Sequence, residues 1–273
     1  MTTVQRLRSR LAPFRPGRRR RLAERRLASE RKANAALTKE IARLKARQRE
    51  IPRDADDETR QVIGLVRDYT MTSNDKLIAL VAGARHIADT GVPGAIVECG
   101  VWRGGSIHAV ARVFAARGVL DRDMFLFDTY TGMTEPTEKD RTPSGKAAAD
   151  MLASSKRTAK VWAVASREDV EQGLRTLPYP FERFTLVEGP VEETIPDAAP
   201  DQIAMLRLDT DWYESTRHEL ENLYDRLVSG GVLIIDDYGS WQGSKEATDE
   251  FIARLPRAPL LLRAGRARIG VKP

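Results

Sequence analysis

The chain has 273 residues, a length that suits one large domain or one domain with an appendage. Its formal charge of +6 is unevenly divided, because residues 1–50 hold 17 of the 45 Lys and Arg but only 4 of the 39 Asp and Glu. The first 50 residues therefore carry +13 and the remainder −7, so attraction to nucleic acid, an anionic membrane surface or an acidic partner is expected from residues 1–50 alone.

Cysteine content and hydropathy exclude further classes of protein. Cys99 is the only cysteine, so neither an intrachain disulfide nor a cysteine-based zinc cluster can form. No apolar run approaches the roughly 20 residues of a membrane-spanning helix. The arginines at 18–21 are followed by Leu-Ala-Glu-Arg-Arg rather than by the apolar stretch of a secretory signal. We expect a cytoplasmic protein that meets a membrane, if at all, at its surface.

The first expected element is a long exposed helix over residues 20–50. This segment is rich in Ala, Leu, Arg, Glu and Lys and contains no Gly or Pro, a composition that favours helix throughout. Leu37, Ile41 and Leu44 follow one another at spacings of four and three residues, which is a short coiled-coil pattern. The pattern indicates a basic helical arm that self-associates, or that contacts an anionic membrane surface or an acidic partner.

A domain boundary is expected just after this helix. The stretch Ile-Pro-Arg-Asp-Ala-Asp-Asp breaks the helix, since the residue before a proline disfavours helical geometry. We predict an arm with its linker over residues 1–60, the linker occupying 51–60, and a single folded domain over residues 61–273.

The sequence pattern of the domain that follows predicts an α/β fold. Short runs of Val, Ile, Leu and Phe alternate with amphipathic stretches, a pattern typical of parallel strands buried by crossover helices. In such a sheet, ligands bind beyond the carboxyl ends of the strands. The expected seven-stranded, mostly parallel sheet comprises 95–99, 124–127, 184–187, 203–208, 232–235, a segment around 260–262 and 267–271.

The first strand ends in a glycine turn that indicates a nucleotide-type ligand. It runs from Glu98 and Gly100 through Val-Trp-Arg to Gly-Gly-Ser106, so the backbone can approach a ligand closely. The turn has neither the Gly-x-Gly-x-x-Gly spacing of dinucleotide sites nor the Gly-Lys-Ser ending of a P-loop, which disfavours hydride and phosphoryl transfer. Asp128 ends the second strand, 28 residues after Gly100, where it could accept hydrogen bonds from ribose hydroxyls.

Acidic residues follow the fourth and fifth strands. The fourth ends in Leu208-Asp209-Thr-Asp and the fifth in Ile235-Asp236-Asp237, so neighbouring strands deliver carboxylates to one edge. One such aspartate alone would often only cap the next helix. Three together predict a hard cation, and oxygen ligands with room for water suit Mg²⁺ rather than zinc.

Four motifs together resemble the macrocin O-methyltransferase family, which includes mycinamicin- and novobiocin-pathway sugar methyltransferases. They are Val-Glu-Cys-Gly-Val-Trp-Arg-Gly-Gly-Ser at 97–106, Phe-Asp-Thr-Tyr-Thr-Gly-Met at 127–133, Asp-Thr-Asp-Trp-Tyr-Glu-Ser-Thr at 209–216 and Ile-Ile-Asp-Asp-Tyr-Gly at 234–239. The resemblance spans about residue 66 to the end and leaves the basic arm outside it. Two stretches depart from the family pattern, 187–195 and 134–160, and both bear on the identity of the acceptor.

The resemblance implies a class I (Rossmann-like) methyltransferase fold, S-adenosylmethionine as cofactor and a sugar or glycoside hydroxyl as methyl acceptor. It also implies Mg²⁺ held by Asp209, Asp236 and Asp237, with Asp209 doubling as general base. The residues that it places around the cofactor are Thr70, Met71, Ser73, Glu98, Gly100, Val101, Trp102, Ser106, Asp128, Thr129, Gly189, Val191 and Asp209.

Two other functions stay open at this point. A nucleic-acid methyltransferase guided by the basic arm would fit the charge, but the chain lacks the Asn-Pro-Pro-Tyr or Asp-Pro-Pro-Tyr segment that exocyclic-amine methyltransferases use against a flipped base. A scaffold whose arm organises partners while the body is inert would bind no S-adenosylmethionine.

Overall fold

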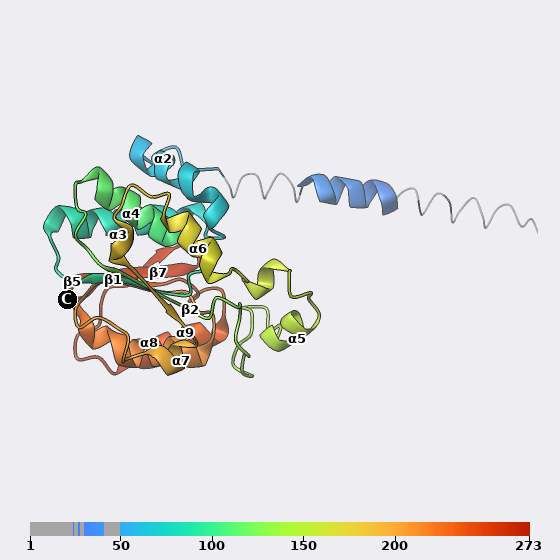
Figure 1. Ribbon diagram of the computed structural model, residues 1–273. Helices are drawn as coiled ribbons and strands as arrows, with labels where there is room; N and C mark the ends of the chain where they lie inside the picture. The colour runs from blue at the N-terminus through green and yellow to red at the C-terminus, as the bar shows by residue number, and fades with distance from the viewer. Residues whose placement is uncertain (1–23, 25–26, 28–29, 41–49) are drawn as a thin grey trace, which may run out of the picture. The chain divides into compact units, whose positions relative to one another are not determined.

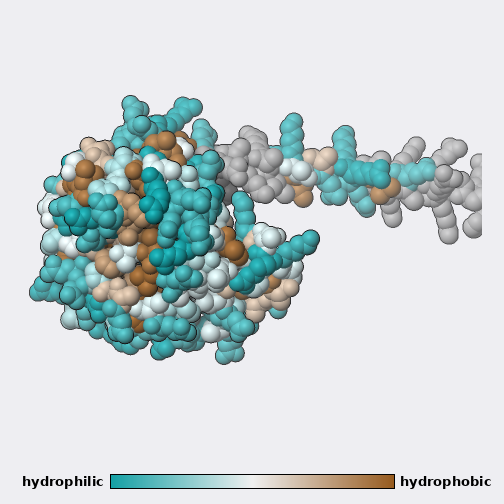
Figure 2. Space-filling view, in the orientation of Figure 1, coloured by the Kyte–Doolittle hydropathy of each residue, from teal (hydrophilic) through white to brown (hydrophobic). Residues whose placement is uncertain are grey.

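The computed structural model describes residues 24, 27, 30–40 and 50–273, and the chain divides into two compact units, Met1–Glu50 and Ile51–Pro273. In the first unit, residues 30–40 are helical and exposed, and Leu37 keeps 60% of its surface in solvent. This helix is mostly hydrophilic (Figure 2). Ile41 and Leu44 of the predicted coiled coil lie outside the described residues. Within the described part of the chain, no helix is both long and apolar enough to cross a bilayer.

The second unit is built on one seven-stranded sheet, as the sequence predicted (Figure 1). The strand order is β3-β2-β1-β4-β5-β7-β6; β3 to β5 run parallel, and β7 is antiparallel to both β5 and β6. The strands are β1 (Ala95–Cys99), β2 (Met124–Asp128), β3 (Phe184–Glu188), β4 (Ile203–Leu208), β5 (Leu227–Ile235), β6 (Leu262–Ala264) and β7 (Ala267–Val271).

One strand begins earlier than its apolar run suggested. β5 starts at Leu227 rather than at Val232, because Leu227 already pairs with Ile203 of β4, and the residues between them form an irregularity before the register resumes at Met205 and Val232. Gly230 donates its backbone N–H to the carbonyl of Lys272 at 2.8 Å. Strand pairing is a property of the backbone, and a hydrophobicity pattern does not report it.

Helices cover both faces of the sheet in two layers (Figure 1). Strand residues alternate between the two cores, so that Ile96 packs with the first layer and Val97 with the second. The first layer holds α2 (Asp57–Val66), α3 (Asn74–Thr90), α4 (Gly105–Ala116) and α6 (Arg167–Leu174), and the second holds α7 (Val191–Thr194), α8 (Tyr213–Leu223) and α9 (Gln242–Ala253). The short helix α5 (Ala148–Ala153) lies apart from both layers, and the 3-10 turns are η2 (Arg67–Tyr69), η3 (Lys160–Trp162), η4 (Phe181–Arg183) and η5 (Tyr224–Arg226).

The expected linker at 51–60 is part of the folded unit. α2 begins at Asp57, and the Asp56 side chain accepts a hydrogen bond from the backbone N–H of Thr59 at 2.8 Å. The guanidinium of Arg60 donates to the carbonyls of Ala55 and Pro52 at 2.9 and 2.8 Å. These bonds order the stretch that was predicted to be a linker because its proline breaks the preceding helix.

The hydrogen-bond ladder continues past the formal ends of the central strands. The N–H of Asp209 donates to the carbonyl of Cys99 at 2.8 Å, and that of Asp236 to the carbonyl of Leu208 at 2.9 Å. Gly100 lies where these backbones meet, with a φ of +83°, and a Cβ there would stand 2.1 Å from the carbonyl oxygen of Asp209. The ladder therefore fixes three strand ends in register at one edge of the sheet.

Candidate functional site

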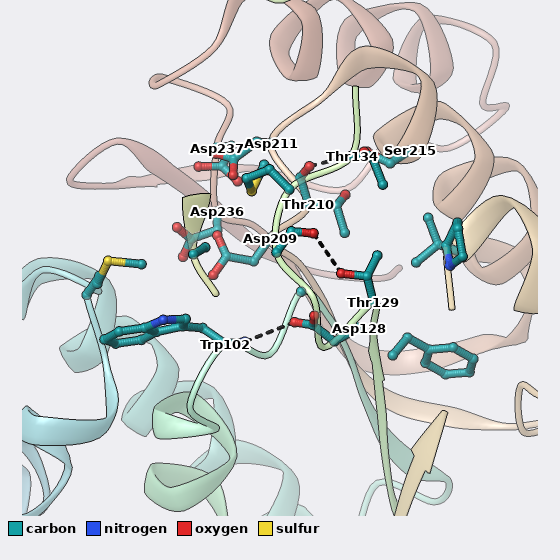
Figure 3. Close-up of a pocket in the computed structure, with 18 of the residues that line it drawn as sticks. Trp102, Asp128, Thr129, Thr134, Asp209, Thr210, Asp211, Ser215, Asp236 and Asp237 are labelled. Carbon is teal, nitrogen blue, oxygen red and sulfur yellow. Dashed lines mark hydrogen bonds between the residues drawn. The ribbon is translucent and has the colours of Figure 1, made fainter. Parts of the chain in front are cut away.

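A cavity of about 260 Å³ lies beyond this edge (Figure 3). Its walls come from the ends of β1, β2, β3, β4 and β5 and from the segments that follow them. The residues predicted for cofactor or metal that line it are Met71, Gly100, Trp102, Asp128, Thr129, Gly189, Val191, Asp209, Asp236 and Asp237. The sequence therefore anticipated two sides of one pocket.

Asp128 organises the glycine turn on one side of the pocket. Its Oδ2 accepts the backbone N–H groups of Val101 at 2.6 Å and Trp102 at 3.0 Å, and its Oδ1 accepts that of Tyr130 at 2.8 Å. Burial raises the pKa of this carboxyl, although the three backbone donors oppose the change. Trp102 is held at a φ of +48° beside it. Oδ2 of Asp128 thus already accepts two donors, whereas Oδ1 keeps a lone pair for a further one.

Five of the predicted cofactor residues do not line the cavity. Val101 contributes its N–H to Asp128, and Ser106 is buried in the first turn of α4. Thr70 accepts the N–H of Thr72 at 3.0 Å, and Ser73 stands at the N-cap of α3. Glu98 is discussed below.

The three predicted metal ligands do come together. One oxygen from each of Asp209, Asp236 and Asp237 lies within 4.8 Å of the others. Figure 3 shows these carboxylates on one side of the pocket with Asp211, and Asp128 on the other. Within the described part of the chain, the buried Oδ2 of Asp237 has no hydrogen-bond donor. A buried carboxylate oxygen without a donor fits a cation in this cluster.

Asp211 is a fourth carboxylate that the sequence reasoning left without a role. It lines the pocket, has a φ of +69°, and accepts a hydrogen bond from the indole N–H of Trp241. Burial, with the charge of Asp209, raises the pKa of Asp211 to about 7. The second aspartate of the Asp-Thr-Asp motif was the available signal.

Two cations in contact with the acids were also missed. Arg207 is buried in β4, with 4% of its side chain exposed, and its Nη2 lies 2.7 Å from Asp209 Oδ2 and 2.7 Å from Asp236 Oδ1. Its Nη1 donates to Oε1 of Glu98 in β1. Lys76 of α3 pairs with the other oxygen of Asp236. An arginine inside the run Ile-Ala-Met-Leu-Arg-Leu was a readable signal, because a charge in a buried strand requires a partner.

Burial and the neighbouring charges shift the pKa values of these carboxyls strongly, and in opposite directions. Burial raises the pKa of Asp209 well above its usual range, with further increases from Asp236 and Asp237, while Arg207 acts in the opposite direction. Burial also raises the pKa of Asp236, but the positive charges of Arg207 and Lys76 outweigh burial and bring this pKa to about 2. Burial raises the pKa of Glu98 to about 7 despite Arg207. The edge is thus crowded with negative charge that added positive charge would relieve.

Beyond the acids, the segment 134–160, which departs from the family pattern, contributes Thr134 to the wall of the pocket. Thr134 lines the cavity, and its carbonyl accepts the indole N–H of Trp212 at 3.2 Å. Trp212 packs edge-on against Trp241, with ring centroids 4.9 Å apart, and joins a small apolar cluster that includes Leu152 of α5. Contacts with Trp212 and its cluster therefore hold this segment beside the pocket.

Comparison with known proteins agrees with this geometry. The family described as Macrocin-O-methyltransferase (TylF) matches residues 14–257. The chain belongs to the macrocin O-methyltransferase family. It is therefore an O-methyltransferase of the class that uses S-adenosylmethionine. The match begins inside the basic arm, whereas the resemblance had been placed from about residue 66, because the four recognisable motifs all lie in the α/β unit.

Two individual relatives and one solved structure are similar to most of this chain. The demethyldecarbamoylnovobiocin O-methyltransferase of Streptomyces niveus is 33% identical over 198 residues, 72% of this chain and 73% of that protein. The 8-demethyl-8-(2,3-dimethoxy-alpha-L-rhamnosyl)-tetracenomycin-C 4'-O-methyltransferase of Streptomyces olivaceus is 34% identical over 182 residues, 62% of each chain. The solved structure of the O-methyltransferase NovP matches with a TM-score of 0.65 and 29% identity, over 84% of this chain and 93% of that one. The class I methyltransferase fold of the family is thereby confirmed.

Proposed function

We propose that the protein transfers a methyl group from S-adenosylmethionine to a hydroxyl of a sugar or glycoside, with Mg²⁺ held by Asp209, Asp236 and Asp237. The observation that carries this proposal is one cavity with a glycine turn on one side and three clustered carboxylates on the other. The acceptor class is supported by the S. olivaceus relative, whose name specifies 4'-O-methylation of a rhamnosyl group.

In the proposed methyl transfer, the metal site and Asp209 have separate roles. A bound divalent cation would orient the acceptor hydroxyl and lower its pKa. Asp209 accepts the proton as the acceptor oxygen attacks the methyl carbon in line with the sulfonium. Bound S-adenosylmethionine would supply the methyl group, with its C–S bond exchanged for the new C–O bond, and the products would be a methyl ether, S-adenosylhomocysteine and a proton on Asp209.

Two carboxylates are available to hold the cofactor. Asp128 lines the pocket, and its Oδ1 can accept a ribose hydroxyl in addition to the backbone N–H of Tyr130 that it already binds. Glu98 is buried; its Oε1 meets Arg207, and its Oε2 has no donor within the described part of the chain. That free oxygen suits the ammonium of the methionine part. Val191 and Gly189 line the wall proposed for the adenine.

Binding and turnover test the proposal separately. Isothermal titration of the full chain with S-adenosylhomocysteine should show one binding event. Incubation with S-adenosylmethionine and a set of rhamnosides and related glycosides should release S-adenosylhomocysteine, and EDTA should abolish the reaction until Mg²⁺ is restored. Absence of cofactor binding would favour the scaffold. Methylation of RNA or DNA, with binding that falls steeply as salt rises, would favour the nucleic-acid alternative.

We propose in addition that the basic arm mediates self-association or contact with an anionic membrane surface. The support is its charge of +13 and the exposed helix over residues 30–40. Sedimentation velocity of the full chain should reveal a concentration-dependent oligomer in the first case. In the second, the chain should co-sediment with phosphatidylserine-containing vesicles but not with pure phosphatidylcholine, and added NaCl should release it.

A further inference from the structure

The stability of the fold does not explain why an arginine stands at position 207. It is a buried cation in a central strand, where an apolar side chain of similar size would usually be as stable or more so. It nevertheless joins carboxylates from three neighbouring strand ends, namely Glu98, Asp209 and Asp236. Thr72, from the segment before α3, lies 3.3 Å from the same guanidinium. A planar guanidinium with five donors is suited to this role, and a lysine is not.

The position of Arg207 links the two ligand sites proposed above. On one side is Glu98, whose second oxygen is buried and has no donor within the described residues. On the other are Asp209 and Asp236, beside Asp237, whose buried Oδ2 likewise has no donor there. Each unpartnered oxygen therefore belongs to a carboxylate that Arg207 contacts or to its immediate neighbour.

Lys76 contacts the same acid cluster in a different way. It lines the pocket, its side chain is 13% exposed, and it pairs with Asp236 Oδ2, the oxygen that Arg207 does not use. Its ammonium is a compact point charge on a flexible stem. It therefore occupies a potential metal ligand without bridging the strands.

We propose that Arg207 is a positioning residue that holds Glu98 for the cofactor and Asp209 and Asp236 for the metal, whereas Lys76 is a displaceable cation that releases Asp236 when the metal binds. This inference rests on the proposed function. It assigns opposite roles to two cations on one carboxylate. Simple electrostatics does not make that distinction, because removing any positive charge beside a cation site should strengthen cation binding.

Metal titration separates the two roles. Mn²⁺ binding, followed by the electron paramagnetic resonance signal of the free ion, should weaken by about 10- to 100-fold in Arg207→Met, since residues that orient metal ligands typically have effects of this size. In Lys76→Met the affinity should instead rise, by roughly tenfold for the loss of one competing charge. The dissociation constant for S-adenosylhomocysteine without metal should also increase in Arg207→Met, because Glu98 loses its partner.

The control is Arg117→Met, which removes a surface arginine that pairs with Glu58 and Asp89. It should leave both dissociation constants at the wild-type values. Circular dichroism and thermal unfolding report whether each variant is folded. If Arg207→Met does not fold, Arg207→Lys decides the question, because it keeps the charge but cannot bridge three carboxylates, and both affinities should still fall.

The outcomes are distinct. Mn²⁺ binding that is unchanged or tighter in Arg207→Met, or unchanged in Arg207→Lys, overturns the positioning role. Weaker or unchanged binding in Lys76→Met overturns the displacement role. A wild-type chain that binds neither Mn²⁺ nor S-adenosylhomocysteine instead refutes the proposed function, on which the inference depends.

Discussion

Two charge networks in the α/β unit use the same kinds of groups but differ greatly in burial. At the acidic side of the pocket, Arg207 and Lys76 meet Glu98, Asp209 and Asp236, and Glu98 and Asp236 keep only 2% and 5% of their side chains exposed. A second network of two arginines and three acids lies at the surface, where Asp89 is 59% exposed. This surface network comprises Arg85, Arg117, Asp56, Glu58 and Asp89 and joins α2 and its N-cap to α3 and the end of α4.

The carboxyl pKa values show the difference. In the surface network, hydrogen bonds from Arg117 lower the pKa of Glu58 more than burial raises it. In the buried network, burial raises the pKa of Glu98 in spite of its contact with Arg207, and at Asp236 it takes both Arg207 and Lys76 to outweigh burial. A surface network of this kind ties helices together at little cost in desolvation. A buried one is costly, which indicates a function other than stability.

The largest expected effect tests whether the buried network serves catalysis. Asp209→Asn removes the proposed base while keeping the size of the side chain, so turnover should fall by about 10²- to 10⁴-fold. The measurement is the initial rate of S-adenosylhomocysteine release at saturating Mg²⁺ with an accepted glycoside. Asp89→Asn makes the same change in the surface network and should leave the rate unchanged. Equal rates for Asp209→Asn and wild type would contradict the assignment.

The second effect concerns stability. Arg207→Met leaves Glu98 and Asp236 buried without their arginine, so the free energy of unfolding in urea should fall by about 3 to 5 kcal/mol. Arg117→Met should cost no more than about 1 kcal/mol, because its partners remain solvated. Similar losses for the two variants would remove the distinction between the networks.

A buried histidine on α4 shows the effect of burial on a titratable side chain. His108 is fully buried and stacks on Tyr69 with ring centroids 4.3 Å apart, and within the described residues neither ring nitrogen has a hydrogen-bond partner. Burial, followed by the charges of Arg112 and Arg103, lowers its pKa from 6.5 to about 4. The folded state therefore resists protonation that the unfolded chain accepts, so stability is lost as the pH falls from about 6.5 towards 4.

His108→Phe keeps the ring but removes the titration. Its unfolding free energy relative to wild type should rise as the pH falls through this range, by up to about 3 kcal/mol. Urea unfolding of both proteins at several pH values measures the difference. A constant difference from pH 7 to pH 4 would show that His108 does not titrate in this way. His86→Phe is a less buried comparison on α3.

The smallest effect is the response to salt. At about 1 M NaCl the screening length is only about 3 Å, so the cost of Arg117→Met should largely disappear. The cost of Arg207→Met should persist, because salt screens a buried pair poorly. Urea unfolding at low and high salt gives both values. A loss for Arg207→Met that also vanishes in salt would mean that water reaches this network.

The sequence anticipated much of the site because its signals are local. A strand that ends in an aspartate, or in a glycine turn, can be read from a few consecutive residues, and in a parallel sheet such ends share one edge. That reasoning located Asp128, Asp209, Asp236 and Asp237 on one pocket. It did not find Lys76, because a lysine on an amphipathic helix looks like a solvated residue until the fold brings it to Asp236.

The sequence by itself determined the order of the strands along the chain, the acidic strand ends and the separation of a basic arm from an acidic body. Local patterns of apolar, glycine and charged residues are sufficient for these features. Tertiary structure alone decided that Arg207 bridges three strands, that the expected linker belongs to the folded unit and that Glu98 is buried beside the pocket rather than on its wall. These depend on contacts between residues far apart in the chain, such as Arg207 and Glu98, which are 109 positions apart, and on desolvation, which no local pattern records.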